Sequence, residues 1–434
     1  MPAKSVSLSE YWRLTRENRN FRRLWSAQII SEIGDWFYTL AIYSLLLEYT
    51  GKASSVALAL ILQVLPQTFI GPIAGVVNDR ISRRKVMIAA DLFRMVIVGC
   101  MLLVRSASMV WLVYPLLFLE TVMWSFFEPA RSSVIPNVVE ADDIVVANTL
   151  SSTTWSFNLA IGSTVGGVVA ALLGRNAVFG LNALSFLVSA LLIGSMRFME
   201  SHTEAHGPLK ARELFDYSPI VAGIRYMRSD PRLTAMVMAK SGVGLLGVSW
   251  VVFPIMGIRT FQLSSLGIAP ERAALISMSI LMGARGVGAL LGPLLSARWA
   301  GRSQERLRKC IAGGFAIGSI GYLLLSAAPS IWVAALLIIV AHSGTSGVWV
   351  FSTTLLQLNT EDKFRGRVFA AELGMTMFVL ACVSFIAGRV LDAGVSPRML
   401  VFGAGLFMIV PFVWWTAMQR HWRDAEARAA VSDN

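Results

Sequence analysis

The stretch "GPIAGVVNDRISRRKV" (residues 71–86) concentrates charge in a chain that has little of it. Between Asp79 and Lys85 it holds one acid and four cations, although charged residues make up only 15% of the chain. Apolar runs flank it, "ALALILQVLPQTFI" before it and "MIAADLFRMVIVGCMLLV" after it. An apolar run of roughly 20 residues is long enough to cross a bilayer as a helix. The stretch is therefore predicted to be a short charged loop between two transmembrane helices.

Similar apolar runs recur along the whole chain of 434 residues. Hydrophobic residues make up 55% of it, and its mean hydropathy of +0.63 excludes an ordinary soluble domain. We therefore predict an all-α membrane protein with twelve transmembrane helices. The predicted helices span residues 24–47, 54–77, 86–104, 109–127, 144–173, 177–196, 233–258, 273–296, 310–327, 330–354, 368–390 and 398–418.

The distribution of basic residues predicts the orientation of these helices. If the N-terminus is cytoplasmic, 28 of the 38 Lys and Arg lie on the cytoplasmic side, among them Arg131 in the loop after the fourth helix. Seven lie on the other side, and three (Arg94, Lys240 and Arg285) lie inside helices. This asymmetry follows the positive-inside rule and places both termini in the cytoplasm. The net charge of +12 then reflects topology, and we expect no nucleic-acid partner.

The chain also consists of two similar halves. "GPIAG" (71–75) resembles "GALLG" (288–292), and "VVEADDIVVANTL" (138–150) resembles "LNTEDKFRGRVFA" (358–370), with offsets of 217 and 220 residues. Six helices in each half make this a parallel two-fold repeat, as in two-bundle transporters. The predicted parts are a cytoplasmic N-terminal segment (1–23), a six-helix bundle (24–198), a cytoplasmic central loop (199–232), a second six-helix bundle (233–419) and a cytoplasmic tail (420–434).

Charged residues inside membrane helices are costly, so each is a candidate functional residue. Counted from Arg23, Glu32 and Asp35 lie ~14 and ~18 Å into the first helix, near the middle of the bilayer. With Gln28 and Thr39 they form one polar stripe, which must face other helices or a cavity. Two carboxylates one turn apart repel each other, and this favours proton exchange near neutral pH. The alternative is a structural pair that a buried base neutralises.

The other buried charges allow two interpretations each. Glu120 lies mid-helix and suits a cavity or a structural role equally. Lys240 and Arg285 are candidate counter-charges for the acids or contacts for an anionic substrate, and Lys240 alternatively snorkels towards the membrane surface. His342 suits a proton relay or a hydrogen-bonded place in the core.

Two further charged positions have simpler interpretations. Asp91 and Arg94 are three residues apart on an outer helix, so we interpret them as a structural pair that supports the charged loop. Glu372 follows the expected start of the eleventh helix by about one turn, where an acid stabilises the helix dipole.

No motif indicates enzymatic chemistry. The sequence has no Walker-type loop, no metal-ligand run and no Ser-His-Asp order. We therefore expect no cofactor, no metal and no enzymatic activity, and an ion gradient, of protons rather than sodium, as the energy source. The Met- and Trp-rich interior favours an amphipathic or aromatic substrate.

The charged loop also resembles the signature loop of the major facilitator superfamily, with Ser82 in place of its second glycine. The matching residues are Gly75, Asp79, Arg80, Arg83, Arg84 and Lys85. The resemblance covers nearly the whole chain and is closest to the drug:proton antiporter branch, which includes macrolide-efflux and enterobactin-exporter-like proteins. It is carried by "SEIGDWF", "ADLFR", "FFEPARSSVIPNVV", "ANTL", "LNALSFLVSALL" and "LLQLNTEDKFRGRV".

This resemblance implies roles for two sets of residues. The loop acid Asp79 would act as a latch between the halves in the outward-facing state, docking on the positive end of a helix or on its arginines. The alternative is a loop that serves topology alone. Gly162, Gly166 and Gly167 resemble the helix-packing glycines of the antiporter motif, with Ser163 in the usual proline position.

Together these observations predict a twelve-helix transporter of the bacterial inner membrane that exports a hydrophobic or amphipathic small molecule in exchange for protons. We expect a monomer in the lipid bilayer. One alternative is an uptake or lysophospholipid-flipping carrier of the same fold. The alternative from another class is a receptor or scaffold that does not transport.

Overall fold

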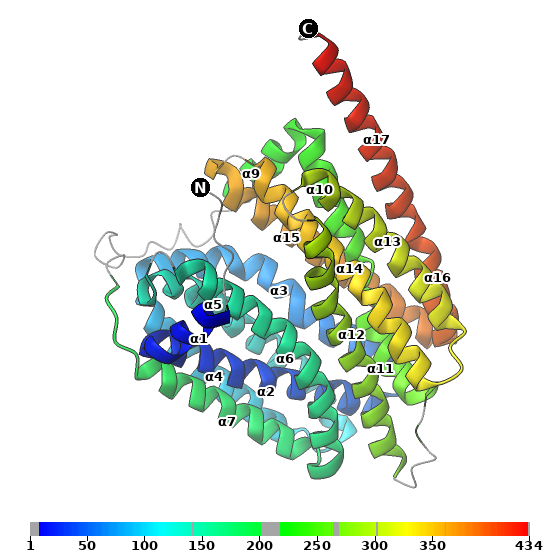
Figure 1. Cartoon of the computed structure of the whole chain (residues 1–434). Coiled ribbons are helices and arrows are strands. Elements are labelled where there is room, and N and C mark those ends of the chain that lie inside the picture. The colour runs from blue at the N-terminus through cyan, green and yellow to red at the C-terminus, as the bar shows by residue number, and fades with distance from the viewer. Residues whose placement is uncertain are drawn as a thin grey trace. The chain divides into compact units, whose positions relative to one another are not determined.

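The computed structural model describes residues 8–140, 143–200, 218–261, 263, 269–300, 303–360 and 362–432. Helices are the only regular secondary structure in these ranges (Figure 1). They are α1 Leu8–Glu17, α2 Arg19–Thr50, α3 Ala53–Arg80, α4 Arg83–Cys100, η1 Met101–Leu103, η2 Ala107–Leu112, α5 Val113–Val138, α6 Ile144–Leu173, α7 Arg175–Gly194, α9 Ser218–Ser229, α10 Pro231–Gly244, α11 Gly247–Arg259, α12 Pro270–Ala300, α13 Gln304–Ser326, α14 Ile331–Asn359, α15 Asp362–Asp392, α16 Pro397–Phe407 and α17 Ile409–Ser432.

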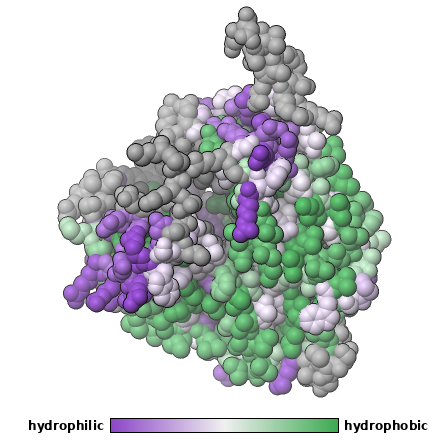
Figure 2. Space-filling view, in the orientation of Figure 1, coloured by the Kyte–Doolittle hydropathy of each residue, from purple (hydrophilic) through white to green (hydrophobic). Residues whose placement is uncertain are grey.

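The prediction of an all-α membrane protein is confirmed. Within the described ranges, eleven segments are long and apolar enough to cross a membrane. The one predicted helix that is not among these eleven, residues 24–47, lies within α2, which is 32 residues long and carries Glu32 and Asp35 among its apolar residues. Large apolar side chains such as Phe93, Trp111 and Leu172 are exposed, and hydrophobic residues cover broad areas of the surface in Figure 2. Such a surface suits contact with lipid.

Two compact units make up the chain. The first unit comprises Met1–Gly51, Leu58–Asp216 and Ser264–Ser279, and the second comprises Lys52–Ala57, Tyr217–Leu263 and Ile280–Asn434. In the first unit α2 packs on α6 and α7, and α4 packs on α5 and α7. In the second unit α13 packs on α14 and α16, while α10 and α11 pack on α15.

Local sequence explains where several helices begin and end. Asn18 separates α1 from α2, and its side chain accepts a hydrogen bond from the Phe21 amide of α2 (2.9 Å), as helix-capping residues do. Gly51 ends α2 with a left-handed backbone (φ 64°), which glycine adopts without strain. In the second unit, Asp392 accepts hydrogen bonds from the amides of Ala53 (2.7 Å) and Ser54 (3.1 Å). A carboxylate thus stabilises the start of α3.

Two helices lie in segments for which no helix was predicted. α1 lies in the predicted N-terminal segment, and α9 lies in the predicted central loop. The prediction relied on apolar runs of bilayer length, and neither segment contains one.

The predicted helix 233–258 is two helices, α10 and α11, with a break at Leu245 and Leu246. A Cβ on Gly247 would lie 2.5 Å from the Leu380 carbonyl of α15, and Ser384 of α15 donates a hydrogen bond to the Gly247 carbonyl (3.0 Å). The break therefore lies where the backbone approaches α15 closely.

Candidate functional site

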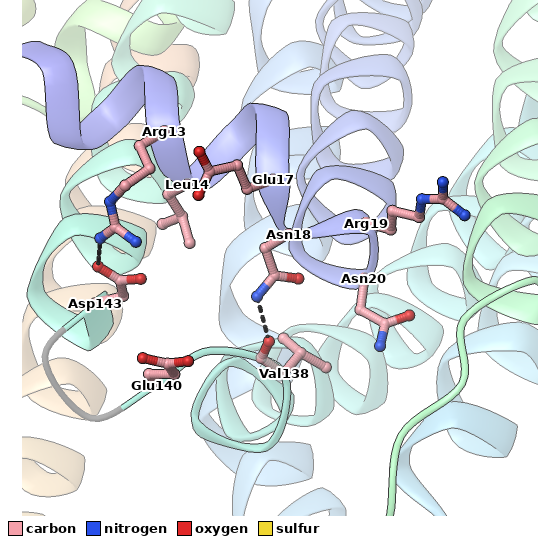
Figure 3. A pocket seen from close by; sticks show the side chains of 9 residues that line it. All are labelled: Arg13, Leu14, Glu17, Asn18, Arg19, Asn20, Val138, Glu140 and Asp143. Atoms are coloured by element: carbon pink, nitrogen blue, oxygen red, sulfur yellow. Dashed lines mark hydrogen bonds and ion pairs between the residues drawn. The ribbon is translucent and has the colours of Figure 1, made fainter.

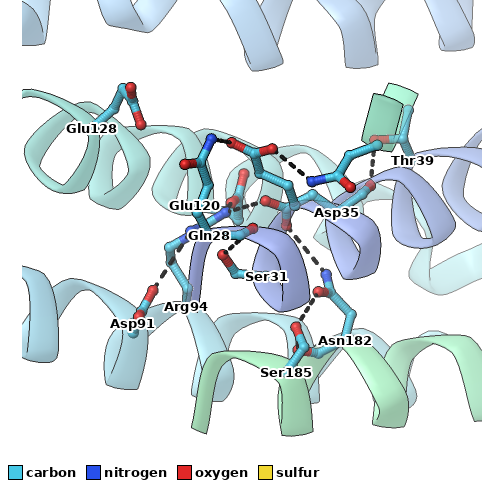
Figure 4. A network of polar contacts seen from close by, with 12 residues as sticks. Gln28, Ser31, Asp35, Thr39, Asp91, Arg94, Glu120, Glu128, Asn182 and Ser185 are labelled. Carbon is cyan, nitrogen blue, oxygen red and sulfur yellow. Dashed lines mark hydrogen bonds and ion pairs between the residues drawn. The ribbon is translucent and has the colours of Figure 1, made fainter. Parts of the chain in front are cut away.

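Arg94 is the centre of a buried polar network in the first unit (Figure 4). Its Nη2 atom lies 2.7 Å from Asp35 Oδ2 and 2.7 Å from Glu120 Oε1. Its Nε atom also donates a hydrogen bond to Glu120 Oε1 (2.8 Å). The Arg94 side chain is 2% exposed, whereas that of Asp35 is 27% exposed. One buried cation thus holds two acids from different helices.

Asp91 adds a third acid to this network. It is fully buried, and its Oδ1 atom lies 3.7 Å from Arg94 Nη1, within ion-pair distance. Asp91 and Arg94 thus form a pair, as predicted, but Arg94 makes its shorter contacts with Asp35 and Glu120. Support of the charged loop by this pair stays a prediction. Side-chain spacing on one helix cannot reveal partners on other helices.

Close packing of α2 on α7 positions Asp35. A Cβ on Gly34 would lie 2.3 Å from Asn182 Oδ1, so only glycine allows this approach. Asn182 Nδ2 lies 3.5 Å from Asp35 Oδ1, and Ser185 donates a hydrogen bond to Asn182 Oδ1 (3.1 Å). The ring of Phe186, also on α7, lies 4.0 Å from the guanidinium carbon of Arg94. Side chains of α7 thus pack against both Asp35 and Arg94.

Glu32 lies in a second network on the same helix. Gln28 Nε2 and Asn158 Nδ2 each donate a hydrogen bond to its carboxylate (2.8 Å in both cases). The nearby cation, Arg131, donates to Gln28 Oε1 (2.9 Å) and pairs with Glu128 (2.5 Å). Amide groups therefore hold Glu32, and the charge of Arg131 is balanced by Glu128.

Arg131 does not lie in a loop as predicted. It is buried within α5, which continues to Val138 although the predicted helix ended at residue 127. The spacing of Glu128 and Arg131 (i, i+3) is a sequence signal that could have indicated an ion pair on a continuing helix. No comparable signal marked Asn158 or Asn182, whose roles depend on helix packing.

In the second unit, Lys240 forms a different buried ion pair. Its Nζ atom lies 2.9 Å from Glu372 Oε1 and donates a hydrogen bond to Thr353 (3.0 Å). The ring of Trp349 lies 4.4 Å from Nζ. The prediction that Glu372 serves the helix dipole is wrong, because α15 begins at Asp362 and Glu372 lies about three turns inside it.

These pairings show that Lys240 is not the counter-charge of Asp35 or Glu120 in this structure, whereas contact with an anionic substrate and the role of Arg285 stay predictions. Asp35 and Glu120 are paired with Arg94, whereas Lys240 is paired with Glu372. Arg285 lies over the ring of Trp250, 3.6 Å from its centroid.

His342 occupies a hydrogen-bonded place in the core of the second unit. Its Nε2 atom lies 3.0 Å from the Tyr322 hydroxyl, and the ring of Phe253 contacts it edge-on with centroids 5.6 Å apart. Of the two interpretations of His342, this arrangement agrees with a hydrogen-bonded histidine in the core rather than a proton relay.

The charged loop between α3 and α4 forms hydrogen bonds with neighbouring helices of the first unit. Arg83 donates to the Ser133 carbonyl (3.0 Å), and Arg84 donates to the carbonyls of Ile193 (3.2 Å) and Gly194 near the end of α7. Cations near the last carbonyls of a helix stabilise its end.

At the start of α4, Glu200 accepts hydrogen bonds from the Ser82 hydroxyl and the Arg84 amide. Gly75 has open space around its Cβ position, Arg80 is partly buried and Lys85 is exposed. The Asp79 side chain lies outside the described part of the structure, so the latch stays a prediction.

The predicted packing glycines lie at close contacts of α6. A Cβ would lie 2.7 Å from the Trp36 side chain at Gly162, and 2.8 Å from the Phe37 backbone at Gly166. At Gly167 it would overlap the Ser279 side chain. Gly162 and Gly166 thus let α6 approach α2 where α2 carries the acids.

A separate pocket of about 460 Å³ lies beside α1 (Figure 3). There Arg13 pairs with Asp143 (2.5 Å), and Asn18 donates a hydrogen bond to the Val138 carbonyl (2.6 Å). The pocket contains none of the buried acids of α2, so we assign it no part in the Arg94 network.

Comparisons with known proteins identify the family. The family model described as "Transmembrane secretion effector" (MFS_3) matches residues 14–433. Macrolide efflux protein A of Streptococcus pyogenes is 27% identical over 359 residues, which cover 81% of this chain and 84% of that protein. The uncharacterized MFS-type transporter YfiS of Bacillus subtilis is 27% identical over 416 residues, 91% of this chain and 93% of that protein. A match to another Bacillus subtilis transporter, YkuC, is 25% identical and spans 64% of each chain.

Solved structures show the same fold. The nucleoside transporter NupG has a TM-score of 0.67 at 12% identity and covers 92% of this chain and 98% of its own. A bacterial homologue of the lysosomal transporter Spinster has a TM-score of 0.68 at 13% identity, covering 93% and 98%. Because the family model matches residues 14–433, the chain belongs to the major facilitator superfamily, in the family described as transmembrane secretion effector, and it is a multi-pass membrane transporter of small molecules and not an enzyme.

Proposed function

We propose that this protein exports a hydrophobic or amphipathic small molecule in exchange for protons, and that the Arg94 network carries the exchanged proton. The observation that supports this most is the charge imbalance around Arg94. Three acids, the partly exposed Asp35 and the buried Asp91 and Glu120, lie within 3.7 Å of one guanidinium group. If all three were ionised, the network would carry two uncompensated negative charges in a low-dielectric interior, which costs several kcal/mol per charge. At least one acid therefore binds a proton.

Asp35 is the acid that exchanges this proton. Its side chain is 27% exposed, whereas those of Glu120 and Asp91 are 10% and 0% exposed. Protons and the polar part of a substrate therefore reach Asp35 first. Its protonation removes one of the two short contacts of Arg94, so proton binding changes the electrostatics between α2, α4 and α5. Such a change biases a transporter between two conformations.

The relatives support export of an amphipathic molecule. One of them is named macrolide efflux protein A, and a macrolide is therefore the first substrate to test. We keep the cytoplasmic placement of both termini from the positive-inside count, and we propose that the protein acts as a monomer.

We also retain the two six-helix bundles and the Asp79 latch as proposals. Arg83 and Arg84 contact α5 and α7 within the first unit, so a latch would depend on Asp79 itself. Asp79→Asn would then shift the protein towards inward-facing conformers about 5- to 150-fold, the usual range of coupling between sites.

Transport assays in proteoliposomes test the proposed function. We expect wild-type protein to move a radiolabelled macrolide when a pH gradient is imposed, in the direction opposite to the protons. Asp35→Asn should abolish this transport, because an amide cannot exchange a proton, but it should retain exchange of labelled for unlabelled macrolide. The control Asp143→Asn changes a buried, ion-paired aspartate that lies outside the network, and it should transport normally.

The same assays separate the alternatives. Macrolide movement with the protons indicates an uptake carrier. Movement of lysophospholipid rather than macrolide indicates a lipid carrier, and no transport of any compound in a panel of amphipathic molecules indicates a receptor or scaffold. Normal gradient-driven transport by Asp35→Asn contradicts the role of this acid.

A further inference from the structure

Asp91 is the one member of the Arg94 network that the proposed exchange leaves without a role. It is fully buried, and neither of its oxygens makes a short hydrogen bond among the described residues. Its partners are Arg94 Nη1 at 3.7 Å and the hydroxyl of Ser189. A buried carboxylate with such weak contacts costs free energy. An unsatisfied group of this kind requires an explanation.

The geometry of Arg94 supplies one. Nε and Nη2 make the short contacts with Glu120 and Asp35, and the remaining nitrogen, Nη1, faces Asp91 at 3.7 Å. A charge-assisted N–H···O contact is about 2.7–2.9 Å long. A shift of less than about 1 Å would therefore bring Asp91 into contact with Arg94.

The phenylalanines around Arg94 permit such a shift. The guanidinium carbon lies 4.0 Å from the ring centroid of Phe186 and 6.0 Å from that of Phe127. Both aromatic rings attract a cation through their faces without fixing its rotation. A rotation of the guanidinium towards Asp91 therefore leaves both ring contacts favourable.

Among the described residues, the charged groups that act on Asp91 are Arg94 of its own helix and Asp35 of α2. Glu120 of α5 is linked to it through Arg94. From α7, the uncharged Ser189 lies beside it. Arg94 is thus the cation that responds when the charge of any of these acids changes.

We propose that Asp91 is the alternative partner of Arg94: when Asp35 binds a proton, the guanidinium leaves Asp35 and pairs with ionised Asp91. This inference rests on the proposed role of Asp35 as the exchanging acid. The proton that Asp91 holds while Arg94 is on Asp35 passes to Asp35, so this step itself neither adds nor removes a proton. Exchange with the solution then takes place at Asp35, the more exposed of the two acids. Asp91 is then a positioning residue that makes the network bistable without contacting the substrate.

A double-mutant cycle in detergent tests this inference without any substrate. Asp35→Asn imitates protonated Asp35 and should place Arg94 on Asp91. Asp91→Asn should therefore change the melting temperature little in the wild type, but should lower it by about 2–10 °C in the Asp35→Asn background, the size expected for coupled residues in contact. Asp91→Glu should restore most of that loss, because it keeps a carboxylate at the same position.

Asp143→Asn is the matched control, since it removes a buried carboxylate from an ion pair outside the network. Its effect should be the same in both backgrounds. Equal effects of Asp91→Asn in both backgrounds would overturn the inference and would make Asp91 a structural residue.

The structure of Asp35→Asn alone gives a second test that needs no stability measurement. The distance between Arg94 Nη1 and Asp91 should contract from 3.7 Å to about 2.8 Å. An unchanged distance would refute the switch even if the double mutant fails to fold. If Asp35→Asn and Asp91→Asn both kept normal gradient-driven transport, that result would instead contradict the proposed function. The two failures are therefore distinguishable.

Discussion

Replacement of Arg94 by alanine tests the electrostatic basis of the network. At 2.7 Å and an effective dielectric constant of about 20, each contact with Asp35 and Glu120 is worth ~6 kcal/mol before desolvation. Desolvation offsets much of this, and loss of one partner from a buried ion pair costs about 3–5 kcal/mol in measured cases. For a unit of this size, that corresponds to a fall of about 6–20 °C in melting temperature.

The assay is thermal unfolding of purified protein in detergent at two pH values. The loss of stability in Arg94→Ala should be largest at pH 8, where Asp35 must bind a proton to keep its place without a cation beside it. It should shrink at pH 5, because proton binding then costs less free energy. Arg94→Lys should recover only part of the loss, since one ammonium group cannot bind two carboxylates as the guanidinium does.

Arg175 is the matched control, because it pairs with Glu48 (2.5 Å) but both side chains are partly exposed. Exposed pairs contribute about 0–1 kcal/mol, so Arg175→Ala should change the melting temperature by a few degrees at most, at both pH values. A melting temperature of Arg94→Ala within about 2 °C of the wild type at pH 8 would refute the claim that Arg94 neutralises the buried acids.

Three further predictions concern packing, the second unit and topology. Gly34→Ala should destabilise the protein by about 1–3 kcal/mol through overpacking. The control Gly180→Ala should be neutral, because the Cβ position of Gly180 has open space around it. Equal melting temperatures of the two variants would contradict the close approach of α2 and α7. Lys240→Met should lower the free energy of unfolding by about 3–5 kcal/mol. Adding Glu372→Gln should restore much of this stability, because no unpaired charge then remains buried. Failure of this rescue would exclude a buried ion pair. In a background without the native cysteines, a cysteine at Lys52 should react with impermeant reagents from outside intact cells, and labelling only from the inside would reverse the orientation.

The sequence predicted the helices well because their signal is local. A bilayer of fixed thickness requires an apolar run of fixed length, and α6 (Ile144–Leu173) coincides with the predicted helix 144–173. The depth of Glu32 and Asp35 in α2 also follows from counting residues along one helix. The helix ends were less predictable where charges lie within the helix. Arg131 and Glu372 were both assigned to the wrong environment for this reason.

The partners of the buried charges depend on which helices pack together, and no local pattern encodes this. Asp35 and Glu120 are 59 and 26 residues from Arg94 in the chain. Local spacing instead indicated Asp91, which is the most distant of the three acids in the folded protein at 3.7 Å. The sequence therefore identified the residues of the candidate site but not the cation that joins them.

Proton release on substrate binding is the most direct test of the central claim that the Arg94 network exchanges a proton. A macrolide is added to solubilised protein in a weakly buffered solution, and the pH change is recorded with an indicator for the wild type and for Asp35→Asn. We expect the wild type to release protons and Asp35→Asn to release none, while both bind the macrolide. Equal release by both proteins would contradict it.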